Sequence, residues 1–390
     1  MALFWQIIVW LCLGALFYTF IGYPALVFVL AHLRAQRTRD TANAAKNLSD
    51  ENYNWPTVRF LILAYNEERV IRKKVENTLD LDYPRDRLQI IVASDGSTDQ
   101  TNAMLSCYGA HEIKFLPLTP RQGKTTVLNQ VIPTLDGEIV VLSDASGLVR
   151  SEALKKLIRH FENEKVGCVS GVYSFDTDDD TLRSATEKLY WLYETFLKKY
   201  ESRVHSTIGA HGALYGFRRN LFKPLHKKTI NDDFILPMRI LQEGYRVQYE
   251  PEAIVVEDES TTLNGEFNRR IRINVGNFQQ IYMLRSLCNP RRGIVALQFV
   301  SHKVLRLASP FFILTLPFAC LLAPGTFYLL LLDLQIAFYL AGVLGVVQEY
   351  FGLRIRYLYL PFYFLMGNVS TVFGFVRFVL RKQSILWKRV

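Results

Sequence analysis

Two consecutive pieces of sequence, Leu88–Ser94 (LQIIVAS) and Asp95–Asp99 (DGSTD), decide the fold of the middle of this chain. The first piece is short and apolar throughout, which is typical of a strand buried on both faces, and the second is an acidic turn. The chain repeats this pattern, with a helical stretch after each turn. The other apolar runs are Val58–Ala64 (VRFLILA), Ile113–Leu118 (IKFLPL) and Glu138–Ser143 (EIVVLS). The alternation predicts an α/β, Rossmann-like domain whose mostly parallel sheet is covered by helices on both faces.

Three of the four apolar runs are followed closely by a carboxylate, namely Glu67, Asp95 and Asp144. Ligands of open α/β sheets bind at the carboxyl ends of the strands, so these acids mark a candidate site. Acids in such positions can instead cap the following helices, as Asp95 and Thr98 could. Three acids on one edge of a sheet favour the ligand site.

The familiar nucleotide signatures do not fit this edge. No GxGxxG follows the first apolar run, which disfavours a dinucleotide-binding domain. Gln122–Thr126 (QGKTT) resembles the end of a phosphate loop, but Leu118 occupies the position of the required first glycine. The remaining interpretation is a nucleotide site built from acids and a divalent metal, because Mg²⁺ takes carboxylates, phosphate oxygens and water.

Charged residues are unevenly distributed along the 390-residue chain, and none precedes Arg34. Residues 1–33 therefore exceed the roughly 20 apolar residues that cross a bilayer. A secretory signal peptide is the alternative, but the segment lacks a basic start and is too long. We expect an uncleaved transmembrane anchor at 1–33 and a globular domain at 34–306. A transmembrane region of about three segments at 307–380 and a basic tail at 381–390 complete the expected organisation.

The two ends of the chain give conflicting predictions of topology. Arg34, Arg37 and Arg39 directly follow the first segment, so the positive-inside rule places the globular domain in the cytoplasm. Three C-terminal spans would put Arg381 and Lys382 on the opposite side, against the same rule. Either one segment lies in the membrane plane or re-enters, or the rule fails, and the sequence leaves the number of spans open.

The net charge of +10 does not require a nucleic-acid partner. The basic residues near Arg34, Arg291 and Lys303 adjoin the apolar segments, where anionic lipid headgroups explain them, so the lipid bilayer is the expected partner. The five cysteines form no CxxC pair and the seven histidines no HExxH pattern, which disfavours a zinc site.

The motifs of the middle domain, taken together and in order, resemble glycosyltransferase family 2, the inverting GT-A enzymes that use nucleotide sugars. The flanking spans are similar to the membrane members of that family, such as the bacterial synthases of exopolysaccharide, poly-N-acetylglucosamine, hyaluronan and cellulose. The matching motifs are Ala64–Glu68 (AYNEE), Asp95–Asp99 (DGSTD), Arg121–Lys124 (RQGK), Ser143–Ser146 (SDAS), Gly212–Arg219 (GALYGFRR), Asn231–Asp233 (NDD) and Tyr249–Ala253 (YEPEA).

The resemblance implies a donor site at the ends of the strands. Ala64, Glu67 and Asp95 would bind the nucleoside, usually uridine, and Lys124 would lie near the base or the phosphates. Asp144 would be the first acid of the metal-binding D-x-D motif, which suits Mg²⁺ or Mn²⁺.

The resemblance also implies a general base. Asp233 matches the last residue of the family's T/S-E-D motif, with Asp232 in place of the glutamate. An inverting transfer needs a base within reach of the acceptor hydroxyl, opposite the departing diphosphate. Asp232 and Asp233 could instead cap the helical stretch Phe234–Leu241, but that interpretation predicts lower stability on mutation and not a selective loss of rate.

The metal motif departs from the family pattern. The usual D-x-D is Asp144-Ala145-Ser146, and Ser146 can offer only a neutral oxygen, which makes it a weak metal ligand. The stretch Asp176–Asp178 is a literal D-x-D, but its acidic surroundings before a helix favour a solvated cap.

The acceptor motif departs as well. The family's processive members carry Q-x-x-R-W, and the corresponding stretch here is Arg269–Ile273 (RRIRI). Arg269, Arg270 and Arg272 are candidates for binding the acceptor or the diphosphate, as arginine suits phosphate oxygens. Ile273 cannot stack on a sugar as tryptophan would, which puts processive synthesis in doubt. A basic amphipathic helix on lipid remains an alternative for this stretch.

The sequence thus predicts an inverting glycosyltransferase that is an integral protein of a bacterial cell membrane, with its catalytic domain in the cytoplasm. It would move a sugar from a nucleotide sugar, usually a UDP-sugar, to a membrane-presented glycan or lipid-linked acceptor in extracellular polysaccharide synthesis. Two alternatives remain: addition of a single sugar to a polyprenyl-linked acceptor, or a non-catalytic subunit that only binds nucleotide sugars.

Overall fold

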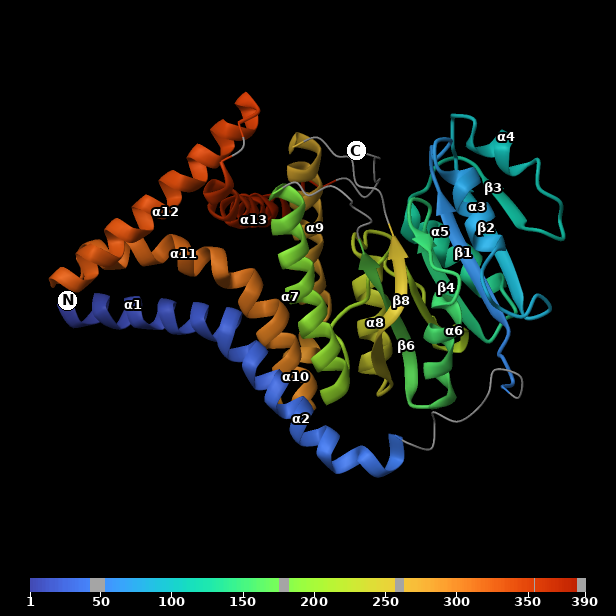
Figure 1. Cartoon of the computed structure of the whole chain (residues 1–390), viewed down its shortest axis with the longest axis horizontal. Coiled ribbons are helices and arrows are strands. Elements are labelled where there is room, and N and C mark those ends of the chain that lie inside the picture. Colours follow the sequence, from blue (N-terminus) through green and yellow to red (C-terminus); the bar gives the residue numbers. More distant parts are fainter. Residues whose placement is uncertain (43–52, 175–181, 257–262, 354, 384–390) are drawn as a thin grey trace.

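The computed structural model describes residues 1–42, 53–174, 182–256, 263–353 and 355–383, and the middle of the chain forms a mixed β-sheet (Figure 1). Within the described residues the sheet has eight strands, in the order β3-β2-β1-β4-β7-β6-β8-β5. The first four neighbours are parallel to one another. They are β1 (Val58–Ala64), β2 (Leu88–Asp95), β3 (Lys114–Leu118) and β4 (Ile139–Asp144). These are the four predicted apolar runs, so the α/β prediction is confirmed.

The other half of the sheet is more irregular and was not predicted as strands. It comprises β5 (Leu148–Val149), β6 (Val166–Ser174), β7 (Tyr215–Arg218) and β8 (Arg246–Val256). Strand β7 joins the two halves, because it is antiparallel to both β4 and β6. Strand β8 then runs parallel to β6, and β5 closes the edge in the antiparallel sense.

Side chains from β1 enter the apolar cores on both faces of the sheet, which explains why the strand has no polar face. Phe60 and Ile62 pack into one core, and Leu61 and Leu63 into the other. The first core is covered by α3 (Ile71–Leu79) and α6 (Ala153–Arg159), the second by α5 (Lys124–Val131) and α8 (Asp232–Gln242). The remaining helices of this region are α4 (Thr101–Leu105), α7 (Leu182–Val204) and α9 (Leu263–Met283).

Helices from the two ends of the chain extend away from the sheet on one side (Figure 1). They are α1 (Ala2–Phe17), α2 (Tyr23–Ala42), α10 (Ile294–Phe299), α11 (Leu305–Leu322), α12 (Thr326–Phe351) and α13 (Arg356–Val379). Short π-helical segments at Tyr18–Gly22 and Val300–Val304 join α1 to α2 and α10 to α11. The predicted boundary at residue 306 falls inside the continuous helical segment 294–322, because α10 runs into α11 without a break.

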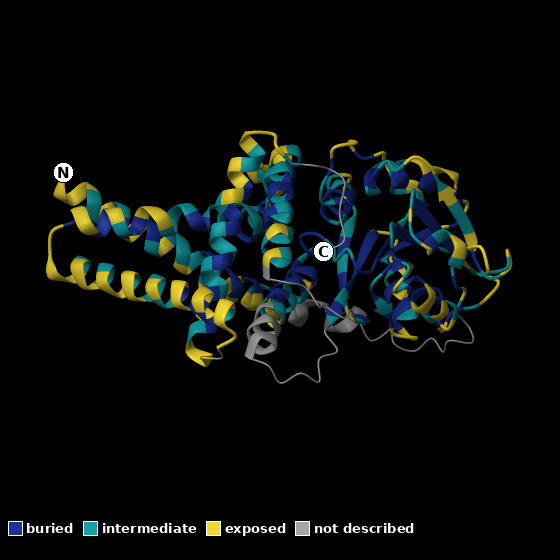
Figure 2. Cartoon of the chain, turned by 90° about the horizontal axis from the view of Figure 1, so that it is seen from above, coloured by how far each residue is buried: buried dark blue, intermediate teal, exposed yellow. Residues whose placement is uncertain are grey.

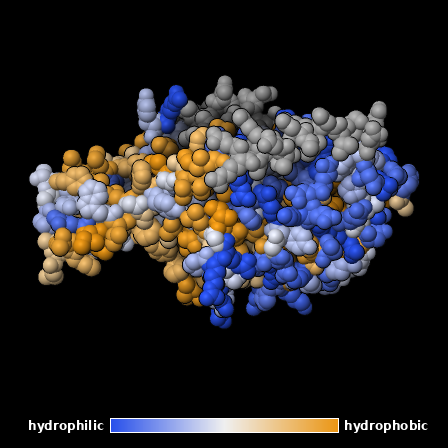
Figure 3. Space-filling view, turned by 90° about the horizontal axis from the view of Figure 1, so that it is seen from below, coloured by the Kyte–Doolittle hydropathy of each residue, from blue (hydrophilic) through white to orange (hydrophobic). Residues whose placement is uncertain are grey.

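Four helical segments among the described residues are long and apolar enough to cross a membrane: 2–34, 294–322, 326–351 and 356–379. Their outer surface carries many exposed apolar side chains, among them Trp10, Leu330, Leu334 and Leu344. Figure 3 shows this apolar surface on the helical end of the molecule and a hydrophilic surface over the sheet, and Figure 2 shows how exposed α12 is. Apolar surface of this extent is typical of a membrane protein.

A buried polar network joins the membrane helices to the domain. Tyr23 in α2 donates a 2.5 Å hydrogen bond to Glu201 in α7, which also lies 2.8 Å from Nδ1 of His302. One turn further along, Arg306 pairs with Glu194 at 2.7 Å. Because buried charges are costly unless they are paired, these contacts fix how the N-terminal and C-terminal helices sit on α7.

Candidate active site

Asp95 anchors the loop that leads into α5. The Asp95 carboxylate is buried and accepts hydrogen bonds from the backbone N–H groups of Gln122 at 2.7 Å and Gly123 at 2.8 Å. The next residue, Gly96, has a φ of +68°, and a Cβ there would lie 2.7 Å from the backbone nitrogen of Arg121. Glycine therefore suits this turn for both its conformation and its size. As a result, Lys124 becomes the first residue of α5, at the carboxyl edge of the sheet.

The loop after β1 meets the loop after β2 at the same edge. Asn66 accepts a hydrogen bond from the backbone of Thr98 at 2.8 Å, and the Arg121 guanidinium lies 3.4 Å from the centre of the Tyr65 ring. Glu67 is buried, and its backbone N–H donates to Thr101 at 2.8 Å. Ala64 lies fully buried at the end of β1, directly before this loop. The predicted nucleoside residues thus gather in one place.

Lys124 connects the end of β4 with the start of α8. Its Nζ lies 3.1 Å from Oδ1 of Asp144 and 3.5 Å from Oδ2 of Asp232. Burial alone would lower the pKa of Lys124, but the nearby carboxylates outweigh burial and raise it. The ammonium therefore stays charged, and it balances two acids that are far apart in the sequence.

Asp233 and Asp144 converge on the backbone of Gly212. A Cβ at Gly212 would lie 3.0 Å from Oδ2 of Asp233 and 3.5 Å from Oδ2 of Asp144. The loop is held there because the Ala210 N–H donates to the Asp233 carbonyl at 3.1 Å. The absence of a side chain at Gly212 leaves room between the two carboxylates. Gly212 belongs to a motif of the sequence, but nothing in that motif predicted this role.

Burial raises the pKa of Asp233 to about 6, and the charges of Asp232 and Asp144 add to the effect. Lys124 and Lys198 act in the opposite direction. A carboxylate with such a pKa is ionised at neutral pH and can accept a proton from a hydroxyl, which suits a general base.

Asp232 is more deeply buried than Asp233 and makes supporting contacts. It lies 3.4 Å from the Tyr215 hydroxyl, which donates to it, and it shares Lys124 with Asp144. The N-cap residue of α8 is Asn231, and the two acids are the first residues of the helix. This geometry disfavours the interpretation of the acids as a capping pair.

The three candidate arginines of α9 separate in space. The charges of Asp233, Asp232 and Asp144 act on Arg272, although burial is the larger influence and lowers its pKa. Arg270 is bound instead by Glu266 at 2.7 Å and lies 6.0 Å from the Tyr363 ring of α13. Arg269 lies 3.8 Å from Glu266. Arg272 is therefore close enough to the site acids for their charges to act on it.

A metal ion at this site would depend on donors beyond the protein. The part of the chain that the structure describes holds no group of three His, Cys, Asp or Glu side chains ready to bind a metal. The converging oxygens of Asp144 and Asp233, with the Ser146 hydroxyl two residues beyond Asp144, are nevertheless the hard donors that Mg²⁺ and Mn²⁺ prefer. The residues fit such an ion if phosphate oxygens and water complete its coordination. The literal D-x-D at 176–178 lies outside the described residues.

A buried lysine supports the loop that carries Asp144. Lys74 in α3 is fully buried, and its Nζ donates to Ser143 Oγ at 2.6 Å and to the carbonyl of Gly147. Ser143 Oγ in turn donates to the Ala213 carbonyl at 2.7 Å. Sequence reasoning missed Lys74, because it stands in the basic helical stretch Arg72-Lys73-Lys74 that resembles a solvated face.

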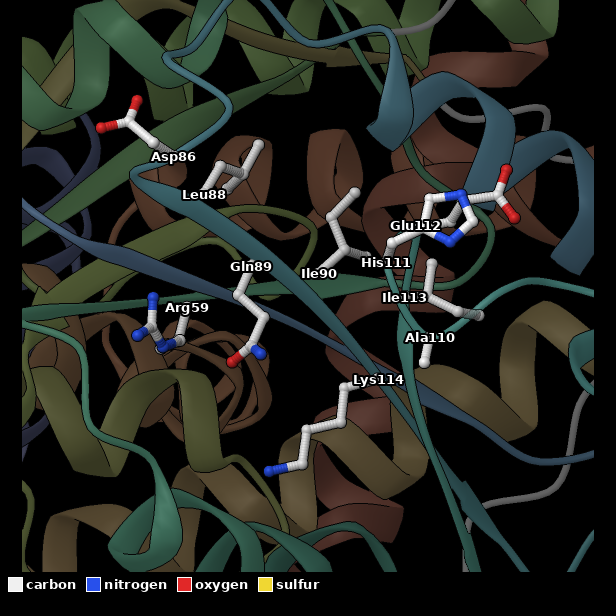
Figure 4. Close-up of a pocket in the computed structure, with 10 residues that line it drawn as sticks. All are labelled: Arg59, Asp86, Leu88, Gln89, Ile90, Ala110, His111, Glu112, Ile113 and Lys114. Carbon is white, nitrogen blue, oxygen red and sulfur yellow. The ribbon is translucent and has the colours of Figure 1, made fainter.

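A separate hollow lies at the opposite edge of the sheet. It has a volume of about 270 Å³ and is lined by Arg59, Gln89, His111 and Lys114, among others (Figure 4). These residues lie at or near the amino ends of β1, β2 and β3, whereas Asp95 and Asp144 end their strands. The hollow therefore contains none of the predicted site residues.

A mostly parallel sheet with acids at its carboxyl edge, a lysine between Asp144 and Asp232 and an acid pair at the start of α8 are the features of a GT-A-like glycosyltransferase. The family model described as "Glycosyltransferase like family 2" matches residues 56–276, more than half of the chain. The chain belongs to this family and is a glycosyltransferase, as the motifs predicted.

Relatives of the chain are named as synthases of different products. The chain is 29% identical over 241 residues to the beta-monoglucosyldiacylglycerol synthase of Nostoc sp., covering 58% of this chain and 50% of that protein. It is 24% identical over 235 residues to the poly-beta-1,6-N-acetyl-D-glucosamine synthase of Staphylococcus epidermidis, covering 59% and 57%. The chain thus spans about half the length of the curated relatives it matches.

A solved structure resembles nearly the whole chain. It is a mannosyltransferase from Pyrobaculum calidifontis in complex with GDP-Man and Mn²⁺, with a TM-score of 0.70 and 22% identity. The match covers 96% of this chain and 100% of that one. At this level of identity the likeness establishes the fold.

Proposed function

We propose that this glycosyltransferase inverts the anomeric centre of a nucleotide sugar, usually a UDP-sugar, with Asp233 as the general base. The convergence of Asp233 and Asp144 on Gly212 carries the proposal, because it brings the candidate base close to the first acid of the metal motif. The acceptor hydroxyl attacks the anomeric carbon while the carbon–oxygen bond to the diphosphate breaks. Asp233 takes the hydroxyl proton, and the nucleoside diphosphate leaves with the bonding electrons.

The donor half of the site follows from the strand ends. Glu67, Asp95 and the backbone of Ala64 would contact the nucleoside. Asp144, with Ser146 as a weak ligand, would hold Mg²⁺ or Mn²⁺, which neutralises charge on the leaving diphosphate. Lys124 and Arg272 would add positive charge on the same side. The Mn²⁺ and GDP-Man of the mannosyltransferase complex support a metal and a nucleotide sugar in such a fold.

The acceptor is proposed to be a lipid-linked or membrane-presented glycan. Four candidate membrane helices flank the domain, and the named relatives make a glucosyl lipid and a polysaccharide. Arg34 follows the first helix, which supports a cytoplasmic domain in a bacterial cell membrane. Ile273 stands where processive relatives carry tryptophan, and this favours a second candidate, the addition of one sugar to a polyprenyl-linked acceptor.

The test is the release of nucleoside diphosphate by the full chain in lipid nanodiscs. UDP-glucose, UDP-N-acetylglucosamine and GDP-mannose would be supplied with bacterial lipid extract, with and without Mg²⁺ or Mn²⁺. We expect metal-dependent release from one donor, lowered at least about 100-fold in Asp233→Asn while UDP or GDP binding persists. Wild-type rates in folded Asp233→Asn would refute the base. Donor binding without release would support the non-catalytic alternative, and product length would separate one addition from many.

A further inference from the structure

Helix α9 forms hydrogen bonds with Asn231, the residue immediately before the acid pair Asp232 and Asp233. Asn231 Nδ2 donates to the carbonyl of Ile273 at 3.2 Å and lies 3.4 Å from the side-chain oxygens of both Asn277 and Gln280. Gln280 is buried, and its own amide nitrogen donates to Asn277 at 2.9 Å. The Asn231 amide nitrogen therefore has three hydrogen-bond acceptors within reach, all from one helix.

The same helix also holds the backbone that leads to Asn231. Gln279 Oε1 accepts from the backbone N–H of Ile230 at 3.0 Å, and its Nε2 donates to the carbonyl of Lys228 at 2.7 Å. We name Asn274, Asn277, Gln279 and Gln280 the amide row. Because amide hydrogen bonds are directional, the amide row fixes both the position and the orientation of the chain entering α8.

Helix α9 packs closely against the Asn231 side chain. A Cβ at Gly276 would overlap the Asn231 amide group. The next layer outward is equally tight, since a Cβ at Gly374 of α13 would lie 2.6 Å from Cβ of Asn274. Asn274 also donates to Ser370 of α13 at 3.2 Å. Contacts thus run without a gap from a candidate membrane helix through α9 to the acid pair, and Figure 1 shows α13 against α9.

We propose that the amide row of α9 is a positioning element for Asp232 and Asp233, and that α13 holds α9 in the position where it acts. The inference rests on the proposed role of Asp233 as the base. Asn231 and the amide row are not themselves the base and take no part in the proton transfer. They set where the first turn of α8 begins, and a base displaced by about 1 Å from its hydroxyl loses much of its rate.

Glycine-to-alanine substitutions test each layer with the full chain in nanodiscs. Gly276→Ala should lower kcat for nucleoside diphosphate release about 10-fold or more, with the donor KM within about two-fold of wild type. Gly374→Ala should give a smaller loss of the same kind. Gly367→Ala is the matched control, because a Cβ there meets nothing within 4 Å, and its kcat should equal that of wild type.

Asn231→Ala removes the hydrogen bonds between Asn231 and α9 without introducing a steric clash. This variant therefore tests the proposal even if Gly276→Ala does not fold. It should also lower kcat at constant donor KM, and adding Gly276→Ala to it should cause no further loss, because the overlapping group is gone. Wild-type kcat in Asn231→Ala and Gly276→Ala, or a rise in donor KM that matches the fall in kcat/KM, would overturn the positioning role. A wild-type kcat in Gly374→Ala would refute the proposal that α13 holds α9 in position.

The two proposals fail separately. If the wild type released no nucleoside diphosphate from UDP-glucose, UDP-N-acetylglucosamine or GDP-mannose, the proposed function would fail before any variant is compared. If the wild type were active and Asp233→Asn inactive, but the Asn231 and Gly276 variants ran at the wild-type rate, only the positioning role would be refuted.

Discussion

At the scale of single residues, Asp233 is governed by what surrounds it. Asp232 and Asp144 repel its charge, Lys124 and Lys198 attract it, and burial favours its neutral form. The sequence placed Asp144 at a strand end and matched Asp233 to a motif. It gave no indication that the two carboxylates meet beside Gly212, because that meeting depends on the antiparallel pairing of β4 with β7.

Activity should therefore depend on pH near neutrality. With the pKa of Asp233 at about 6, kcat/KM should fall as the pH drops from 7 to 5, because a protonated carboxyl cannot accept the hydroxyl proton. The pKa is raised above its unfolded value, so this group stabilises the fold more as the pH falls through the same range. Measured together over falling pH, kcat/KM should decline while the Asp233 contribution to the unfolding free energy grows. An acid limb that is absent or centred near pH 4 would contradict this assignment.

Gly212→Ala should inactivate the enzyme without unfolding it. The added methyl would lie 3.0 Å from Oδ2 of Asp233, in the space between the two carboxylates. We expect kcat to drop at least about 10-fold with little change in the thermal midpoint. Gly14→Ala in α1 is the control, because a Cβ there meets nothing within 4 Å. Equal activity of both variants would show that the space beside Gly212 is not used.

At the scale of elements, burial explains why β1, β2 and β4 could be predicted. Strands β1, β2 and β4 lie between helices on both faces, so each is a continuous apolar run. Strand β8 alternates buried and partly buried residues on either side of the exposed Pro251 and Glu252, and β7 has only four residues. Both gave weak signals in the sequence, and their partners lie far away in the chain.

The support of β4 by α3 makes a prediction at this scale. Lys74→Met keeps the volume of the side chain but leaves the Ser143 hydroxyl and the Gly147 carbonyl without its ammonium. We expect a loss of about 1–3 kcal/mol in the free energy of unfolding and a higher metal concentration for half-maximal activity. Lys73→Met, on the exposed face of the same helix, is the control for denaturant and metal titrations. An unchanged metal dependence of activity in Lys74→Met would show that Lys74 does not affect metal binding by Asp144.

At the scale of the whole molecule, two ends of the chain combine into one membrane-facing unit. Helix α1 packs against α11, and the network of Tyr23, Glu201 and His302 ties both ends to α7. This arrangement makes the position of the domain relative to the bilayer a property of the entire chain, and it can be tested with a native residue.

Cys107 is an exposed native cysteine on the domain, while Cys12, Cys168 and Cys320 are buried. If the domain faces the cytoplasm, a membrane-impermeant maleimide should label Cys107 in inside-out vesicles and leave it unlabelled in right-side-out vesicles. The Cys107→Ser variant is the control, because any labelling that remains in it comes from another cysteine, such as the half-buried Cys288. Labelling of Cys107 in sealed right-side-out vesicles would reverse the proposed topology.

The sequence by itself determined the parallel half of the sheet, the apolar ends of the chain and the acids at the strand ends. Each of these can be recognised from residues that are adjacent in the sequence. Burial on both faces of a sheet or in lipid requires a run of apolar residues, and the acids directly follow such runs. The tertiary structure alone decided that Lys124 bridges Asp144 and Asp232, that Lys74 is buried, and that Asn231 is hydrogen-bonded to α9. These contacts join residues far apart in the chain, and no local pattern specifies which distant side chain will satisfy a buried charge or amide.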